Sequence, residues 1–396
     1  DALRAQGVIG RFGLAFPATP LGRAVANEAF VFGLQQTSAA GAPGTRSNLA
    51  CVNAGGGPGG PIRLEATYYD GDTGVANATK DTFDLSPFQW EQKSFPLALR
   101  GLTYGYAVVR RVWGGDQFVC YGVLNDNLNG DGAFVPMVPN DVPSRTASAV
   151  VPVILEAAGY TSEVTFANRT SRDISGLFAL IPSGDPVPDW GYFDLPSRSQ
   201  FTLPNIVQEL RDVGFYAPPG TVGSVFVQFL DGQFRVDQSD TQARIPTSEG
   251  FVGVRTTTTR AGGRLGLAYG YTPIGEAADT EAWVYGLQQT GTRGVEGGTR
   301  SNLAVVHALG GEVEDLRLEV TYFGPLGNEL GKEPECSPCT LAPGQWRQFN
   351  APLARFGAWQ GYARIRRVSG SDQFLAYGVL NDQGNDDGSY VPMIVP

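Results

Sequence analysis

The sequence predicts an all-β fold built of antiparallel sheets. The chain has 396 residues, including 53 Gly and 27 Pro, a composition that favours short strands joined by tight turns over long helices. A strand–turn–strand pattern at 116–126 and 131–137 returns almost unchanged at 372–382 and 387–393, so the chain contains an internal repeat. Residues 62–69 alternate apolar and polar side chains, as in a sheet with one wet face.

The repeat extends well beyond this pattern. Residues 44–50 are identical to residues 298–304, and the middle of the chain holds a fainter third copy, in which Gln200-Phe201 resembles Gln89-Trp90. We therefore expect a strand-like arm at 1–27 and three domains at 28–139, 150–271 and 281–396.

The first repeat unit has the size of an immunoglobulin-like β-sandwich, since it shows seven candidate strands in about 110 residues. We expect these strands at 30–36, 47–53, 62–69, 89–95, 104–112, 117–124 and 133–138. In the middle unit residues 205–211 predict a helix, started by Pro204, that caps one end of the sandwich. The matching residues 96–100 and 352–356 predict shorter turns at the same place.

The four cysteines form two candidate pairs. Cys51 and Cys120 both fall on the core side of their strands, where the last unit has Val305 and Ala376, so the two sites change together. We expect a disulfide between them; the alternative is two buried thiols acting as small hydrophobes.

Cys336 and Cys339 could form half of a zinc site, but the chain has a single histidine, His307, and the other two ligands are missing. We expect a local disulfide. Two disulfides imply an oxidising compartment outside the cytoplasm.

Net charge and hydropathy exclude two classes of partner. The formal charge is −10, which is unfavourable for nucleic acid and for anionic lipid. No apolar run approaches the roughly 20 residues that span a membrane. We expect no nucleic-acid partner and no membrane span.

Three strings carry a resemblance at family level: Arg300 to Val306, Ala376 to Asp382, and Asp387 to Met393. They resemble tandem modules in large exported proteins of environmental bacteria, and the resemblance covers nearly the whole chain. It implies an exported, modular, all-β protein. It implies no activity, because those modules have none established.

Enzyme motifs are missing from the sequence. A Ser-His-Asp triad would have to use His307, which stands where the first unit has Asn53, and we expect His307 at the surface or at a loop edge. There is no Gly-x-Ser-x-Gly elbow, HExxH motif or phosphate-binding loop. We expect no catalytic residue.

The acidic turn before the last strand of each outer unit is the best candidate site. It concentrates oxygen donors, as a calcium loop does, although the spacing does not fit an EF-hand and the same residue types make plain turns. The candidate ligands for calcium are Asn125, Asp126, Asn129, Asp131, Asp382, Asn385 and Asp387. No other cofactor is expected.

The arm has a strand pattern without a sheet of its own. Residues 10–16 match residues 263–269, which we assign as the closing strand of the middle domain. A lone strand must find a sheet edge. It could add to another subunit as a donor strand, fold back on its own first domain, or belong to a longer covalent array. Its candidate assembly residues are Val8, Phe12, Leu14 and Phe16.

We expect a non-enzymatic extracellular or cell-surface structural protein, a subunit of a filament, sheath or surface layer whose partners are copies of itself. The alternative is an adhesin or carbohydrate-binding array that binds surface glycans. It would use exposed aromatic residues such as Trp90, Trp113, Trp190 and Trp346.

Overall fold

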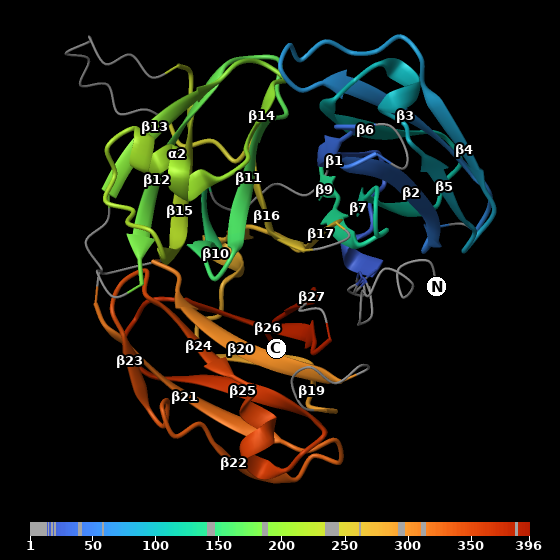
Figure 1. Ribbon diagram of the computed structural model, residues 1–396. Helices are drawn as coiled ribbons and strands as arrows, with labels where there is room; N and C mark the ends of the chain where they lie inside the picture. Colours follow the sequence, from blue (N-terminus) through green and yellow to red (C-terminus); the bar gives the residue numbers. More distant parts are fainter. Residues whose placement is uncertain are drawn as a thin grey trace.

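The computed structural model describes residues 14, 16, 19, 21–38, 42–57, 59–140, 147–183, 189–233, 245–260, 263–291, 298–309, 314–384 and 387–396. Within these ranges the chain is almost entirely strand, with one short α-helix and a few 3-10 turns. The sheets are antiparallel throughout, so the predicted all-β fold is confirmed (Figure 1). We call the three pairs of sheets the first, middle and last modules. In each, the sheet that contains the module's first strand is the front sheet and the other is the back sheet.

The first module follows the 3-10 turn η1 (Leu21–Arg23). Its front sheet has the order β4-β3-β6-β1-β9 and its back sheet the order β5-β2-β7-β8. Seven strands lie close to the predicted ranges, while the short strands β4 and β9 were not predicted as separate strands. The bounds are β1 (Glu28–Gln35), β2 (Thr45–Gly55), β3 (Ile62–Asp70), β4 (Asp81–Leu85), β5 (Trp90–Ser94), η2 (Ala98–Arg100), β6 (Tyr104–Trp113), β7 (Gln117–Asp126), β8 (Gly132–Pro136) and β9 (Val138–Pro139).

The middle module repeats this plan. Its front sheet runs β13-β12-β15-β10, with β18 on β10, and its back sheet runs β14-β11-β16-β17. Pairing of β10 with β11 joins the two sheets at one corner. The bounds are β10 (Ser148–Ala157), β11 (Tyr160–Asn168), β12 (Ile174–Pro182), β13 (Asp189–Leu195), β14 (Gln200–Leu203), α2 (Ile206–Asp212), β15 (Val222–Asp231), β16 (Gly250–Arg260), β17 (Gly263–Gly270) and β18 (Thr272–Pro273).

The last module follows η3 (Ile274–Glu276). Its front sheet runs β19-β25-β21-β22, with β23 on β21, and its back sheet runs β24-β20-β26-β27. The bounds are β19 (Glu281–Gln288), β20 (Thr299–His307), β21 (Leu316–Phe323), β22 (Glu329–Lys332), β23 (Cys339–Leu341), β24 (Trp346–Asn350), η4 (Pro352–Phe356), β25 (Gln360–Ser369), β26 (Phe374–Asp382) and β27 (Gly388–Pro392).

Side-chain alternation explains the sandwich of the first module. Ile62, Leu64, Ala66 and Tyr68 on β3 point into the core and are at most 1% exposed, as predicted, while Arg63 is exposed. Burying a side chain of the size of Ile62 or Leu64 contributes roughly 1.5–3 kcal/mol relative to leaving it in water.

The repeated Tyr-Gly-Val-Leu-Asn-Asp string owes its glycine to close packing between the two sheets. A Cβ added at Gly122 on β7 would lie 2.9 Å from Leu34 and 3.0 Å from Val31. Gly378 on β26 meets Leu287 at 3.1 Å in the same way. A larger residue would push β1 or β19 away from the sheet below.

The predicted helix is confirmed as α2. Asn205 is its N-cap and accepts a hydrogen bond from the Gln208 amide, while Ile206, Val207 and Leu210 are buried against the sandwich. The 3-10 turns η2 and η4 take the same place in the outer modules, as the sequence predicted.

Each contact between consecutive modules joins a front sheet to a back sheet, and the three modules group around one centre rather than in a line (Figure 1). The outer face of the first module's front sheet lies on the outer face of the middle module's back sheet. Phe30, Phe32 and Tyr106 of the first module form one buried cluster with Ala167 and Phe251 of the middle module. The rings of Phe32 and Phe251 stack with centroids 4.9 Å apart.

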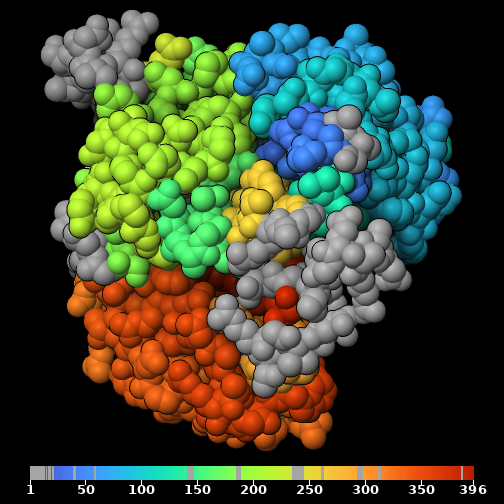
Figure 2. Space-filling model, in the orientation of Figure 1, coloured from blue at the N-terminus to red at the C-terminus, as the bar shows by residue number. Residues whose placement is uncertain are grey.

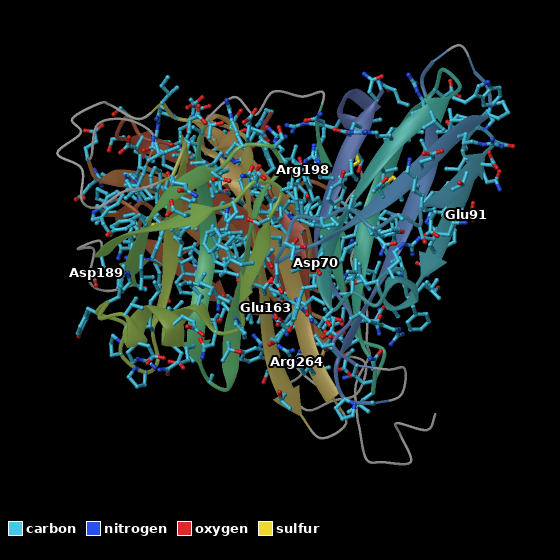
Figure 3. All side chains as sticks on the ribbon, turned by 90° about the horizontal axis from the view of Figure 1, so that it is seen from above. Asp70, Glu91, Glu163, Asp189, Arg198 and Arg264 are labelled. Carbon is cyan, nitrogen blue, oxygen red and sulfur yellow. A yellow bond between two sulfur atoms is a disulfide. The ribbon has the colours of Figure 1, made fainter. Side chains whose placement is uncertain are left out.

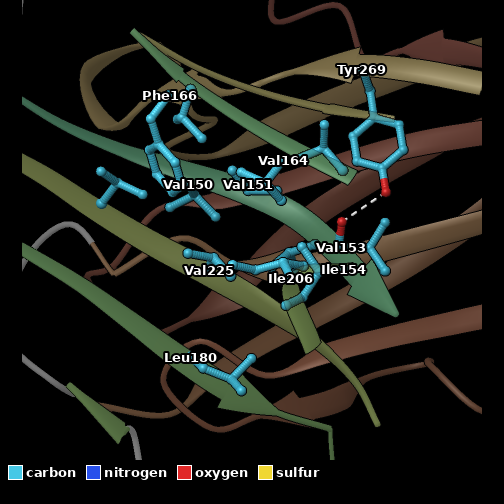
Figure 4. Packing of buried hydrophobic residues seen from close by; sticks show 14 of the residues in the cluster. Val150, Val151, Val153, Ile154, Val164, Phe166, Leu180, Ile206, Val225 and Tyr269 are labelled. Carbon is cyan, nitrogen blue, oxygen red and sulfur yellow. Dashed lines mark hydrogen bonds between the residues drawn. The ribbon is translucent and has the colours of Figure 1, made fainter. Parts of the chain in front are cut away.

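The second contact repeats the first, one module further along. Ile181 and Ser224 lie on the outer face of the middle module's front sheet and are 3% and 1% exposed. Ser224 donates to the Gly344 carbonyl, next to Trp346 of the last module's back sheet. The middle core and this sheet belong to one hydrophobic cluster, part of which is seen in Figure 4. Figure 2 shows the three modules in contact on one face.

Both predicted disulfides are present, and the described residues contain no free cysteine. Cys51 and Cys120 are directly opposite each other on β2 and β7, at the positions that Val305 and Ala376 occupy on β20 and β26. Cys336 and Cys339 close a loop beside β21 and are buried. The pairing predicted from joint substitution is therefore confirmed.

The last module supplies a natural replacement for the first of these disulfides. We expect Cys51→Val with Cys120→Ala to fold, because Val305 and Ala376 fill the same core positions. We expect a loss of about 2–4 kcal/mol, because a cross-link closing a loop of this length (a separation of 69 residues) is removed. Urea unfolding of the native and double-variant proteins measures the difference. Equal midpoints would contradict a stabilising role for this cross-link.

Candidate functional site

The first acidic turn is held by hydrogen bonds from its own backbone. Asp126 Oδ1 accepts from the amides of Leu128 and Asn129, at 2.9 and 3.0 Å. Asn129 Oδ1 accepts from the Asp131 amide at 2.7 Å. The Asp126 amide donates to the Asp131 carbonyl, which closes the turn between β7 and β8. This is the geometry of an Asx-type turn.

The same turn holds the edge strand of the middle module. Asp126 Oδ2 accepts from the Arg264 amide at 3.1 Å, and Asp131 Oδ2 accepts from the Gly266 amide at 2.8 Å. Asn129 Nδ2 donates to the Arg264 carbonyl at 3.0 Å. The first turn therefore satisfies outward-facing backbone groups of β17, which its own sheet leaves unpaired. Asn125 lies beside it and accepts from Asn48 Nδ2 at 3.3 Å.

The second acidic turn has the same closing bond. The Asp382 amide donates to the Asp387 carbonyl at 2.8 Å, and Asp382 Oδ1 accepts from the Gly384 amide. Asp387 Oδ1 accepts from the Gly388 amide. The predicted ligand Asn385 lies outside the described residues.

Calcium remains a prediction from the sequence for both turns. In the described ranges no group of three or more His, Cys, Asp or Glu side chains is arranged to hold a metal ion. The carboxylates of the first turn accept backbone hydrogen bonds, which is the chemistry of a structural turn.

The two turns meet across the molecule. Asp131 and Asp387 occupy equivalent places in the first and last modules, and their carboxyl groups lie close enough to interact. They are 0% and 5% exposed. Two buried carboxyl groups this close together do not readily carry a charge at the same time, so a proton on one of them is favoured. Burial raises the pKa of Asp131 to about 6, although the Gly266 amide, Asp387 and Arg255 act in the opposite direction.

Further charges surround this pair. Arg255 on β16 is buried, and Glu163, Asp131 and Asp126 offset the cost of burying its guanidinium. Glu163 accepts from Gln35 of the first module at 2.5 Å. Figure 3 places Glu163 and Arg264 along the border between the first and middle modules.

His307 is not at the surface, so that expectation is wrong. The side chain is fully buried, its Nε2 lies 2.9 Å from the Glu314 carbonyl oxygen, and its Nδ1 accepts from the Leu309 amide. Burial lowers the pKa of His307, although Asp372 lies 3.4 Å away. It replaces Asn53, whose amide group also bridges backbone groups of a loop. The His307 ring therefore has the same structural role as the Asn53 amide group.

The arm is described at two of its four candidate assembly residues. Val8 and Phe12 lie outside the described residues. Phe16 packs edge-to-face on Tyr121 and Phe134 of the chain's own first module, with centroids 5.4 and 5.6 Å apart. Leu14 lies against Gly132 at the same sheet edge. Its match Leu267 lies against Gly388, and Tyr269, the match of Phe16, stacks on Tyr390.

The match between Gln200-Phe201 and Gln89-Trp90 is wrong by one residue, and for this reason one contact between modules was not predicted. Ala167 of the middle module is the equivalent of Val52 in the first module. Ala167 pairs with Gln200 and Val52 pairs with Trp90, so Gln200 is the equivalent of Trp90 and not of Gln89. A shift by one residue exchanges the two faces of a strand. Gln200 therefore faces the first module, where its Oε1 accepts from the Gly33 amide and its Nε2 donates to the Gly105 carbonyl.

A groove between the middle and last modules also escaped the sequence analysis. It has a volume of about 560 Å³, and its lining includes Pro182, Tyr216, Pro218 and Trp346. The sequence signal was available in Trp346, but the residues opposite it come from distant segments.

Asp131→Asn tests whether the buried Asp131 carboxyl keeps its proton. Between pH 4 and 6 the native state keeps a proton on Asp131 that the unfolded chain has lost, so the free energy of unfolding falls as the pH rises. This stabilising contribution is lost above about pH 6, and the free energy of unfolding falls by at most about 3 kcal/mol over this range. The variant cannot titrate and should lack this fall. Urea midpoints at pH 4.5 and 7 measure it.

The matched control is Asp84→Asn, which changes an exposed carboxylate on β4. It should keep the native difference between the two pH values. The same pH dependence in Asp131→Asn and in the native protein would show that the buried pair does not titrate in this range.

Comparison with known proteins leaves the function open. No protein-family model matches the chain, and no curated protein matches it. A putative beta-galactosidase from Bacteroides fragilis is 11% identical, with 66% of this chain and 36% of that chain covered and a TM-score of 0.16. The tetra-tandem repeat in the extending region of a large adhesion protein is 10% identical, with 93% and 74% covered and a TM-score of 0.12. TM-scores this low support no conclusion about function.

Proposed function

We propose that the chain is a non-enzymatic structural protein, a building block of an extracellular filament, sheath or surface layer. The observation that supports this most is the repeated stacking of modules in one sense, front sheet on back sheet. Each contact buries apolar side chains and fixes the direction of the next module. A contact that joins a front face to a back face can be repeated from one module to the next, which supports an assembly of many copies.

The disulfides support a place outside the cytoplasm. Cys51–Cys120 and Cys336–Cys339 are both buried cross-links, and such bonds persist in oxidising compartments. No helix in the described ranges is long and apolar enough to cross a membrane. These two findings are compatible with a secreted or surface protein.

The donor-strand form of this proposal has less support than the stacking form. A donor strand would add to a sheet edge of another copy. Leu14 and Phe16 instead lie against the chain's own first module. We therefore place the contact between copies on sheet faces.

Negative-stain electron microscopy of native material tests the proposal. We expect filaments, sheets or sheaths with a repeat set by one chain. We also expect a variant lacking residues 1–16 to assemble, because the stacking faces remain. Native material that contains isolated particles at every concentration would contradict a structural role.

A second candidate function is carbohydrate binding, and the groove at Trp346 supports it. Tyr216 in this groove is 64% exposed, and aromatic faces are common platforms for sugar rings. Among the other aromatics first considered, Trp90, Trp113 and Trp190 are 51%, 62% and 53% exposed.

Glycan-array binding with Tyr216→Ala tests this second candidate. We expect at least a tenfold loss of any glycan signal, because the ring that lines the groove is removed. Trp113→Ala removes an equally exposed ring outside the groove and serves as the control. Equal loss in both variants, or no binding by the native protein, would reject the groove as a glycan site.

A further inference from the structure

The contact between consecutive modules joins two different faces, a front sheet and a back sheet. A contact of this type is heterologous and can be repeated without limit. The chain contains it twice. The front face of the last module and the back face of the first module take part in neither contact.

The front face of the last module carries the aromatic set that the first module buries. The strand pairing makes Trp283 the equivalent of Phe30 in the first module, because the two residues pair with equivalent positions of the neighbouring strand. By the same register Tyr285, Phe323 and Tyr362 correspond to Phe32, Tyr69 and Tyr106. Phe32 is fully buried under the middle module, whereas Tyr285 is 44% exposed.

The four rings of this front face already form a preorganised cluster. Trp283 and Tyr285 stack with centroids 6.0 Å apart, and Phe323 and Tyr362 stack at 5.3 Å. The Arg364 guanidinium lies over Trp283 and Phe323, at 5.8 and 5.5 Å. Aromatic and arginine side chains are the residues that contribute most at protein interfaces.

The back face of the first module is a more exposed copy of a face that is buried in the last module. Val306, Leu375 and Tyr377 of the last module are at most 3% exposed beneath the middle module. Their equivalents Val52, Val119 and Tyr121 are all partly exposed.

The tryptophan of this back face shows the same difference. Trp90 donates to the Tyr121 hydroxyl at 2.7 Å, as Trp346 donates to Tyr377 at 2.8 Å. Trp90 is 51% exposed, whereas Trp346 is partly buried beside the middle module. Phe16 lies at the β8 edge of this face, as Tyr269 of the middle module lies at the β27 edge of the last module's back sheet.

We propose that the front face of the last module binds the back face of the first module in a second copy of the chain. This contact would continue the stacking seen twice within the chain, and it rests on the proposed structural function. Both halves of the contact are present on one molecule, on its first and last modules. Each copy then offers a further free face to the next, which gives an open filament or, if the rotation closes, a ring.

A mixing experiment tests this contact. Tyr285→Asp places a charge on the front face of the last module, and Trp90→Glu places one on the back face of the first. Each variant alone should be monomeric in sedimentation velocity at concentrations where the native protein grows in mass. A one-to-one mixture should form dimers and nothing longer, because each variant retains the face that the other has lost.

Three controls make the result interpretable. Leu99→Glu charges an exposed site on η2, away from both faces, and should assemble like the native protein. Melting temperatures within a few degrees of native show that the charged variants fold. The uncharged truncations Tyr285→Ala and Trp90→Ala should each weaken self-association at least tenfold.

The outcomes separate this contact from the proposed function. A native protein that stays monomeric at all concentrations, single variants that assemble like native, or a mixture that stays monomeric would each overturn the proposed contact. Native filaments by microscopy together with assembling variants would leave the structural function standing and reject these two faces. Mixed dimers together with native protein that forms only closed rings would support the contact and reject the open filament.

Discussion

The structure depends on covering the apolar outer faces of its sheets. A sandwich buries the inner face of each sheet, but here the outer faces also carry apolar and aromatic residues, such as Phe32 and Ile181. Water contact with these faces is unfavourable, so each one packs on the next module. The modules are therefore not independent domains joined by linkers, because each one packs on its neighbours. The middle module has one outer face on each neighbour, and its core is continuous with a sheet of the last module.

Polar groups determine the register of these apolar contacts. Apolar faces can slide over one another, whereas a buried hydrogen bond has one partner. Gln200 binds two backbone groups of the first module, and Ser224 binds one of the last. The acidic turn adds Asp126 and Asp131, which hold the outward edge of β17. Three modules meet at this strand, so the residues first considered as calcium ligands serve the packing of the whole chain.

Features within one module could be predicted from the sequence, and contacts between modules could not. Strand alternation gave the core side of β3, and the joint change at Cys51 and Cys120 gave their pairing, because both signals lie within a repeat. The meeting of Asp131 with Asp387 has no periodic signal, since it depends on how two modules are oriented. His307 was misplaced because a polar residue beside a loop is usually exposed, and here its ring replaces the amide of Asn53. Gln200 was misplaced because a single-residue shift in a short strand leaves the sequence match almost as good.

The cross-link between β2 and β7 has a mechanical consequence for a protein under tension. When a chain is pulled from its two ends, residues between the halves of a disulfide cannot extend. Cys51 and Cys120 are 69 positions apart in the sequence, and an extended chain gains roughly 3.3–3.6 Å in length for each residue released. The first module thus withholds roughly 230–250 Å of length that the last module, with Val305 and Ala376 at these positions, can release. When the molecule is stretched from its ends, the last module would therefore extend further than the first.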